Sequence, residues 1–134
     1  MNSLFYSRLL IAGSILGAMG VIIGAFGAHF LKSRLAASDL DIIRTGVLYL
    51  FIHVGIIFIV ALLARNNTPS RLLKSAGLFF IVGVILFSGS LFLLATQSLT
   101  GLDISNAGIL TPIGGICFIT GWGLLTIYSF SLKS

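Results

Sequence analysis

Charged side chains are scarce in this sequence, and glutamate is missing altogether. Charged residues make up 8% of the 134 residues, against about 25% in an average soluble domain. Apolar residues contribute 57%, and the mean hydropathy is +1.16. This balance excludes an ordinary soluble domain and predicts one membrane domain over residues 1–134. No basic run is long enough for a nucleic-acid surface, so we expect no nucleic acid among the partners.

Cysteine is also rare, since Cys117 is the only one. A single cysteine excludes an internal disulfide and any multi-cysteine metal site. Two histidines without nearby carboxylates make a poor zinc site, and no glycine-rich phosphate or dinucleotide motif follows a strand. The hydroxyls and amides inside the apolar stretches show no nucleophile–base pattern. We therefore expect no metal, no cofactor and no catalytic residues, so that the chain is not an enzyme.

Four apolar stretches are each long enough to cross a bilayer, which takes about 20 residues. They cover residues 9–28, 45–64, 75–97 and 107–130, and none contains Asp, Lys or Arg. Continuously apolar segments can cross lipid only if their backbone hydrogen bonds are made internally, as in helices. The predicted fold class is therefore all-α, an integral membrane four-helix bundle with short loops.

The positive charges predict the orientation of this bundle. With four spans, both termini and the second loop lie on one side of the membrane. The basic residues on that side are Arg8, Arg65, Arg71, Lys74 and Lys133, and those on the other side are Lys32, Arg34 and Arg44. Because the side richer in Lys and Arg usually faces the cytoplasm, we expect both termini there.

The start of the second helix carries a capping signal. Ser38 and Asp41 resemble a capping box in which Asp replaces the usual Glu or Gln. This places the helix start near Asp39, outside the hydrocarbon. Asp41 and Arg44 are three residues apart and can pair on the surface of that helix.

The third and fourth helices have less definite starts. Pro69 or Ser70 opens the third helix. For the fourth, Thr111 fits an N-cap followed by Pro112 at the first helical position, which leaves residues 107–110 as an apolar loop or a short re-entrant piece. The alternative is a kinked helix that begins at Gly108.

Glycines repeat along one face of the first apolar segment. They are Gly13, Gly17, Gly20, Gly24 and Gly27. Their spacing of four, three, four and three residues places them within an arc of about 80° on a helix. In lipid, small residues at this spacing allow the close backbone contact that holds helices together. We expect this face, and Gly89, Gly114 and Gly115 in the later segments, to pack against neighbouring helices.

His53 is the only histidine well inside an apolar stretch. Ionisable groups within a membrane are costly and are functional candidates for that reason. Counting inward at 1.5 Å per residue from the ends of the stretches places Ser88, Ser90 and Trp122 at a depth similar to that of His53. His29 lies at the outer end of the first stretch. The candidate polar pocket consists of His29, His53, Ser88, Ser90 and Trp122. The alternative is a neutral histidine that bonds to a neighbouring helix.

Several motifs together carry a family resemblance. They are GAFGAH at 24–29, LFSGSL at 86–91, TPIGG at 111–115 followed by Gly121 and Trp122, and Thr45, Gly46, Val47, Tyr49 and His53 in the second segment. The chain thereby resembles the YwdK/YgdD-type family of small four-span membrane proteins, a domain-of-unknown-function family. It departs from the family's pattern at Phe30, where the family has glycine. The resemblance implies a bacterial inner-membrane protein and no established activity.

Three kinds of function agree with these features. The first is a structural or accessory protein that contacts itself or another membrane protein through its glycine-rich helices within the lipid bilayer. The alternative is a binding or transport protein for a small or lipidic molecule, with His53 in its pocket. Exporters of the small multidrug-resistance kind need a membrane carboxylate, which these spans lack. A third alternative, an enzyme at the membrane surface, would have to use Asp39, Asp41, Asp103 and His29.

Overall fold

The structure is a computed structural model that describes residues 2–66 and 70–132. It consists of four long α-helices and two short 3₁₀-helices. In chain order these are α1 (Asn2–His29), η1 (Leu31–Ser33), α2 (Ala37–Asn66), α3 (Arg71–Thr100), η2 (Ser105–Ile109) and α4 (Leu110–Ser131). All four long helices are apolar and long enough to cross a bilayer, and the described residues include no strand. The predicted all-α membrane four-helix bundle is confirmed.

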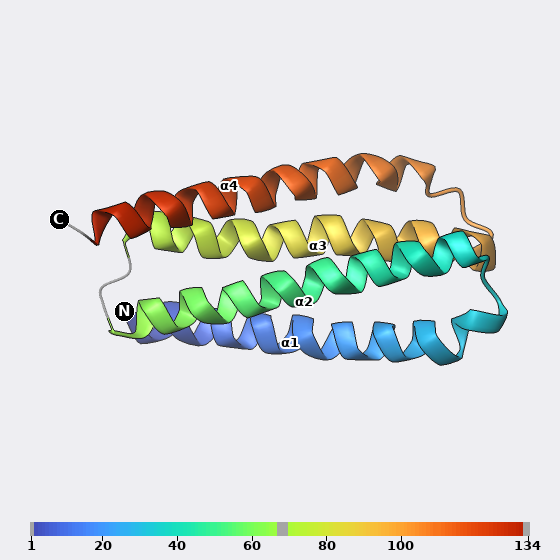
Figure 1. Ribbon diagram of the computed structural model, residues 1–134, viewed down its shortest axis with the longest axis horizontal. Helices are drawn as coiled ribbons and strands as arrows, with labels where there is room; N and C mark the ends of the chain where they lie inside the picture. Colours follow the sequence, from blue (N-terminus) through green and yellow to red (C-terminus); the bar gives the residue numbers. More distant parts are fainter. Residues whose placement is uncertain (1, 67–69, 133–134) are drawn as a thin grey trace.

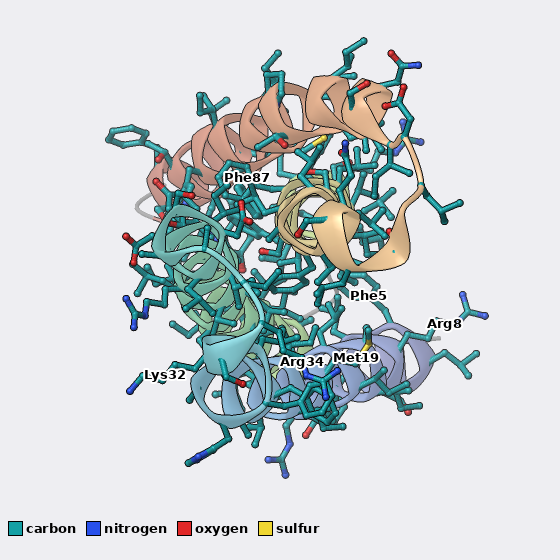
Figure 2. All side chains as sticks on the ribbon, turned by 90° about the vertical axis from the view of Figure 1, so that its right-hand side faces the viewer. Phe5, Arg8, Met19, Lys32, Arg34 and Phe87 are labelled. Carbon is teal, nitrogen blue, oxygen red and sulfur yellow. The ribbon has the colours of Figure 1, made fainter. Side chains whose placement is uncertain are left out.

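The helices run up and down in sequence order, so that both chain ends lie at the same end of the bundle (Figure 1). α2 and α3 are central, because α1 packs mainly on α2 and α4 packs mainly on α3. In the described chain, no Cα atom of α1 lies within 8 Å of one in α4. An end-on view shows α1 and α4 on opposite sides of the bundle (Figure 2). The bundle is therefore open, with two outer helices.

The glycine face of α1 packs against α2. At each of the five glycines, an added Cβ would lie at most 3.7 Å from an atom of an α2 side chain. The partners, in order from Gly13 to Gly27, are Phe58, Val54, Leu50 with Phe51, Val47 and Ile43. Since lipid tails provide no hydrophobic force between helices, this close contact is what holds the pair together.

Between α3 and α4, phenylalanine side chains fill the space that glycines leave on the facing helix. Phe118 of α4 lies against Gly83 of α3, while Phe80 of α3 lies against Gly121 of α4. The closest approach is at Gly114, where an added Cβ would lie 2.5 Å from the backbone nitrogen of Phe87. Glycine at these positions leaves the space that each aromatic ring or the facing backbone fills.

The packing prediction is wrong within this chain for Gly89 and Gly115. An added Cβ at either position would meet no atom of the described chain within 4 Å. Gly89 lies four residues after Ile85 and four before Leu93, both exposed, and therefore on the outer face of α3. Gly115 is rotated by about 100° from the packed Gly114, which turns it away from α3.

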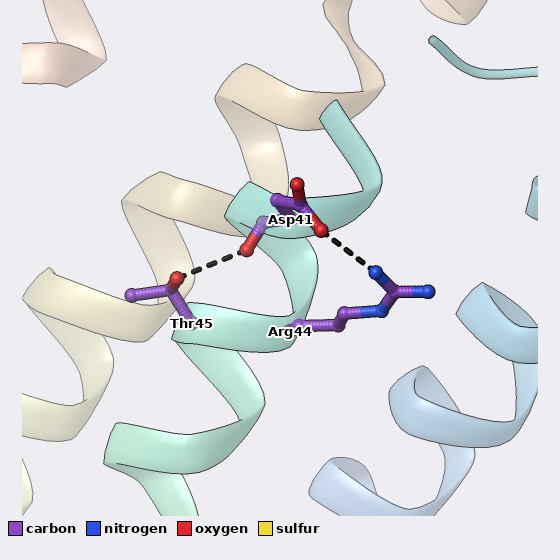
Figure 3. Close-up of polar contacts among 3 residues, drawn as sticks. All are labelled: Asp41, Arg44 and Thr45. Carbon is purple, nitrogen blue, oxygen red and sulfur yellow. Dashed lines mark hydrogen bonds and ion pairs between the residues drawn. The ribbon is translucent and has the colours of Figure 1, made fainter. Parts of the chain in front are cut away.

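The second helix begins earlier than its capping signal predicts. α2 starts at Ala37, so Ser38 lies inside the helix and the predicted start near Asp39 is wrong by two residues. The Asp41–Arg44 pair is present, with an N–O distance of 2.7 Å, and the Thr45 hydroxyl donates to the Asp41 carbonyl (Figure 3). Such an exposed pair contributes only about 0.2–1 kcal/mol.

The other two predicted helix starts have different outcomes. Ser70 is the N-cap of α3 and its side chain accepts a hydrogen bond from the Leu73 N–H, while Pro69 lies outside the described residues. α4 begins at Leu110, so both predicted starts, Pro112 and Gly108, are wrong. The preceding 3₁₀-helix leads directly into α4, and proline is tolerated within a first helical turn.

Charge is distributed unequally between the two ends of the bundle. The end that holds the termini carries Arg8, Arg65, Arg71 and Lys74, with Lys133 outside the described residues. The opposite end carries the bases Lys32, Arg34 and Arg44 together with the acids Asp39, Asp41 and Asp103. These six charges cancel, whereas the described residues of the terminal end sum to four positive charges. Acidic residues contribute little to membrane orientation, so the count that matters is four described bases at the terminal end against three at the opposite end. This small excess agrees with cytoplasmic termini, which remain a prediction.

Candidate functional site

His53 lies near the middle of α2 and is buried, with 4% of its surface exposed. Its Nδ1 lies 2.8 Å from the Tyr49 carbonyl, and its Nε2 lies 3.4 Å from the indole nitrogen of Trp122. A carbonyl only accepts and an indole N–H only donates. A neutral imidazole that carries its proton on Nδ1 therefore satisfies both partners, and the bond to Trp122 connects α2 with α4.

Aromatic rings enclose the His53 imidazole. It stacks on Phe118 with ring centroids 3.5 Å apart and an interplanar angle of 6°. Phe80 lies 5.9 Å away, and Trp122 approaches edge-on at 6.3 Å. In the part of the chain that is described, no Cα atoms of α2 and α4 come within 8 Å. The aromatic cluster around His53 therefore bridges these two helices through side chains.

The two serines bond elsewhere. Ser88 donates to the Gly46 carbonyl at 2.8 Å and so connects α3 with α2. Ser90 donates to the Phe87 carbonyl at 2.9 Å and shares a hydrogen bond of 2.7 Å with Thr111 of α4. Thr111 and Trp122 are eleven residues apart on α4, or about 16 Å along the helix. The serine contacts therefore lie farther than His53 from the termini. We call the end of the bundle opposite the termini its outer end.

This arrangement contradicts the prediction of one shared pocket. His29 is the exposed last residue of α1, a helix that stays away from α4 in the described chain. The predicted residues thus occupy three places, with only His53 and Trp122 in contact. The depth count failed because α2 begins two turns before its apolar stretch, so that Gly46, and not His53, is level with Ser88.

A groove that was not predicted from the sequence lies between α1 and α2 at the outer end of the bundle. Its volume is about 540 Å³. It is lined by Gly24, Gly27, Ala28, Lys32, Leu40, Ile43, Arg44, Val47, Leu48 and Phe51. The signal for it was present in the sequence, because two glycines of the α1 face come just before Lys32 and face the α2 segment that begins with Arg44.

A second hollow, of about 500 Å³, lies at the same end between α2 and α3. Its lining includes Asp39 and Asp103 together with Gln97 and Ser98. Hydrogen bonds from the Ser105 hydroxyl and backbone N–H hold the pKa of the Asp103 carboxyl below its usual range. Asp41, the third acid considered for surface chemistry, instead pairs with Arg44.

Comparison with known proteins identifies the family. The family model described as "Protein of unknown function (DUF423)" matches residues 23–115. The chain belongs to this family. The matched region contains the lining of the α1–α2 groove, His53 and the contact of Gly114 with Phe87, and it ends before Phe118 and Trp122.

Its relatives are bacterial membrane proteins that share most of its length. The chain is similar to the UPF0382 membrane protein YwdK of Bacillus subtilis, 36% identical over 118 residues that cover 88% of this chain and 92% of the relative. A UPF0382 membrane protein of Haemophilus influenzae is 38% identical over 130 residues, which cover 96% and 98%. The UPF0382 inner membrane protein YgdD of Escherichia coli K12 is 34% identical over 125 residues, covering 93% and 91%. No solved structure matches the chain.

These names confirm the predicted family and the bacterial inner-membrane localisation. The names indicate no specific activity, and the chain is a membrane protein of this family.

Proposed function

We propose that this protein is a non-enzymatic accessory protein of the membrane that acts through helix–helix contacts, and that the outer face of α4 makes them with a second copy. The observation that carries the proposal is the open bundle. α4 has close backbone neighbours only in α3 and η2 within the described chain. Its opposite face is largely exposed, most of all at Ile119, with 74% of its surface accessible.

The glycines of α4 fall into two groups that support this choice of face. Gly114 and Gly121 receive α3, whereas Gly115 and Gly123 have no atom of the described chain within 4 Å of an added Cβ. Gly115 and Gly123 are eight residues apart and lie within about 80° of each other on the helix, with Ile119 between them. Small residues on an exposed membrane face allow a second backbone to approach closely.

The buried polar groups support a structural role. His53 bonds to Trp122, Ser88 bonds to a carbonyl of α2, and Ser90 bonds to Thr111 of α4. Each of these bonds joins two helices, which is how polar side chains commonly act inside membrane bundles. Their hydrogen-bonding groups are engaged in holding the helices together.

Subunit counting in lipid vesicles tests this function. We would count photobleaching steps of fluorescently labelled full-length protein at increasing dilution in the bilayer. The wild type should be a dimer, and Gly123→Leu or Gly115→Leu should weaken association at least tenfold, about 1.4 kcal/mol. Gly55→Leu is the matched control, because Gly55 is an exposed α2 glycine that also has open space around it.

Three results would overturn the proposal. A monomeric wild type would remove self-association, and unchanged association in both α4 variants would remove the α4 face. Loss of association in Ala18→Leu alone, at an exposed position of α1, would move the contact to the other outer helix.

The binding alternative is favoured by one observation, the groove between α1 and α2. It is not favoured by His53, whose two ring nitrogens and one face are occupied by Tyr49, Trp122 and Phe118.

A further inference from the structure

The groove between the outer ends of α1 and α2 combines two different surfaces. Its walls are mainly glycine and aliphatic side chains, with Phe51 at the deep end. Two of the described lining residues, Lys32 and Arg44, are basic and none is acidic. The groove therefore has an apolar part and a positively charged part, as a site for an anionic amphiphile requires.

The charges lie at the membrane surface end of the groove. Lys32 belongs to η1, just beyond the end of α1, and Figure 2 shows it reaching outward where α1 joins α2. Figure 3 shows Arg44 pointing from α2 toward the side of α1. Arg44 gives one hydrogen bond to Asp41 through NH1. Since a guanidinium has five N–H donors, several remain for an anion.

The groove is shorter than one membrane leaflet. From Arg44 to Phe51 the lining extends over seven residues of α2, about 10 Å along the helix. From Lys32 back to Gly24 it extends over a similar stretch of chain. Half of a hydrocarbon core is about 15 Å thick, so an acyl chain that enters beside the basic residues would reach the deep end well before the mid-plane.

Glycine explains why the groove is open at this level. An added Cβ at Gly24 would lie 3.6 Å from a methyl carbon of Val47, an ordinary contact distance that leaves space beside it. At Gly27, which also lines the groove, the corresponding distance to Ile43 is 3.1 Å. A larger side chain at either position would occupy space that glycine leaves to the groove.

We propose that this groove binds one anionic phospholipid, with its phosphate between Lys32 and Arg44 and the upper part of one acyl chain along Gly24, Gly27 and Val47. Charge complementarity selects the occupant, because the described groove lining holds two bases and no acid. A zwitterionic lipid of the same shape gains less from Lys32 and from the Arg44 donors that Asp41 leaves free. The site is independent of the α4 contact proposed above, since it uses α1, η1 and α2 alone.

Native mass spectrometry of the full-length protein, released from lipid discs that contain equal amounts of phosphatidylglycerol and phosphatidylcholine, tests this site. The wild type should retain one phosphatidylglycerol per chain with at least a tenfold preference over phosphatidylcholine. Lys32→Gln combined with Arg44→Gln should abolish the preference. Arg71→Gln combined with Lys74→Gln, at the opposite end of the bundle, is the matched control and should leave it unchanged.

A second pair of variants tests the apolar part of the groove. Gly24→Leu adds a side chain inside the groove and should reduce retained lipid at least tenfold. Gly17→Leu is its control, because an added Cβ there also meets only one side chain, Val54, at a similar distance of 3.7 Å, but outside the groove lining. Far-ultraviolet circular dichroism of each variant establishes that the helices are intact.

Several outcomes would overturn the lipid site. Equal retention of the two lipids would mean an ordinary boundary lipid, and a preference lost only in the Arg71 and Lys74 variant would place the anion at the other end. An oligomer that disappears with Gly24→Leu but persists with Gly123→Leu would assign the groove to a second protein chain.

Discussion

The α1–α2 and α3–α4 interfaces both depend on glycine, yet they differ in which helix supplies the side chains that fill the space. At α1–α2, α1 contributes the glycines, and α2 contributes aliphatic and phenylalanine side chains. At α3–α4, each helix contributes both glycine and phenylalanine, so that the Phe118 ring fills the space at Gly83 and the Phe80 ring the space at Gly121, while the backbone of Phe87 lies against Gly114.

The difference has a physical consequence. In a reciprocal interface, a shift of one helix along the other moves every ring out of its place, so the register is fixed from both sides. In the one-sided α1–α2 interface, every atom that faces a glycine belongs to a side chain, whereas at Gly114 the nearest atom is backbone, which cannot turn aside. The one-sided pair can therefore leave a groove at its outer end, whereas the reciprocal pair brings backbone against backbone at Gly114.

The largest expected effect comes from the backbone contact. Gly114→Ala should destabilise the bundle by about 1–3 kcal/mol, the usual cost of overpacking, because the new Cβ would lie 2.5–2.9 Å from backbone atoms of Phe87 that cannot move aside. Gly55→Ala is the control, because an added Cβ there meets no atom of the described chain within 4 Å and lies outside the proposed α4 contact; it should be neutral within about 0.5 kcal/mol. Unfolding in mixed micelles with increasing SDS, followed by circular dichroism, measures both. Equal losses of stability in the two variants would show that the backbone contact at Gly114 is not what destabilises the bundle.

A smaller effect is expected at the one-sided interface. In Gly20→Ala the new Cβ would lie 2.5 Å from a terminal methyl of Leu50, which can rotate away, so the loss should be below about 1 kcal/mol. Gly17→Ala makes an ordinary contact of 3.7 Å and should be neutral or stabilise by up to about 1 kcal/mol through helix propensity. The same unfolding assay applies, and a loss at Gly20 that exceeds the loss at Gly114 would reverse the proposed order.

The polar bridge between α2 and α4 should contribute less still. Its hydrogen bond of 3.4 Å is long, and hydrogen bonds between membrane helices average about 0.6 kcal/mol. A double-mutant cycle of His53→Phe and Trp122→Phe should therefore give a coupling energy of about 0.5 kcal/mol. A cycle of Trp122→Phe with Ser88→Ala, which bonds at a different level, should be additive. Coupling in the second cycle as large as in the first would show that the two levels are not independent.

The smallest effect concerns the connection between α3 and α4. Hydrogen bonds from Ser105 lower the pKa of Asp103 in the folded protein, so the charged carboxylate favours the folded loop. This contribution is complete above the pKa of Asp103 in the unfolded chain and is lost as the pH falls through its folded pKa. Ser105→Ala removes the hydroxyl bond and should raise the pKa of Asp103 toward the ordinary range of an aspartate, as measured by carboxyl NMR titration. No change in that variant would show that Ser105 does not hold the carboxylate.

The sequence predicts the one-sided interface better than the reciprocal one, for a physical reason. The glycine face of α1 repeats within a single helix, so its spacing alone shows that Gly13 to Gly27 lie together. At α3–α4 the partners are on different helices, and which phenylalanine meets which glycine depends on the relative height of the two. The sequence therefore could not choose between Gly114 and Gly115, although only Gly114 meets the facing helix.

Relative height also accounts for the error in the candidate site. Counting residues from the ends of the apolar stretches correctly placed His53 and Trp122 at the same level. It placed Ser88 and Ser90 at the wrong level, because α2 extends outward as far as Ala37. The groove went unnoticed because its lining comes from two helices and a connecting turn. The starts of α2 and α3 and the ends of α1, α2 and α4 were predicted to within about two residues. By contrast, α1 begins at Asn2, well before its apolar stretch, α3 extends to Thr100, and the 3₁₀ turn before α4 was not predicted.

An added Cβ at Gly115 or Gly123 of α4 would meet no atom of the described chain within 4 Å, and in our proposal these glycines mark a contact between two copies. Disulfide cross-linking in the membrane tests it most directly, in a Cys117→Ala background that removes the native cysteine. Ile119→Cys, at the centre of the outer face of α4, should form a covalent dimer on oxidation, because a two-fold contact brings equivalent residues together. Ile22→Cys, on the exposed face of α1, should not. Absence of a dimer at position 119, or equally efficient cross-linking at position 22, would contradict the account.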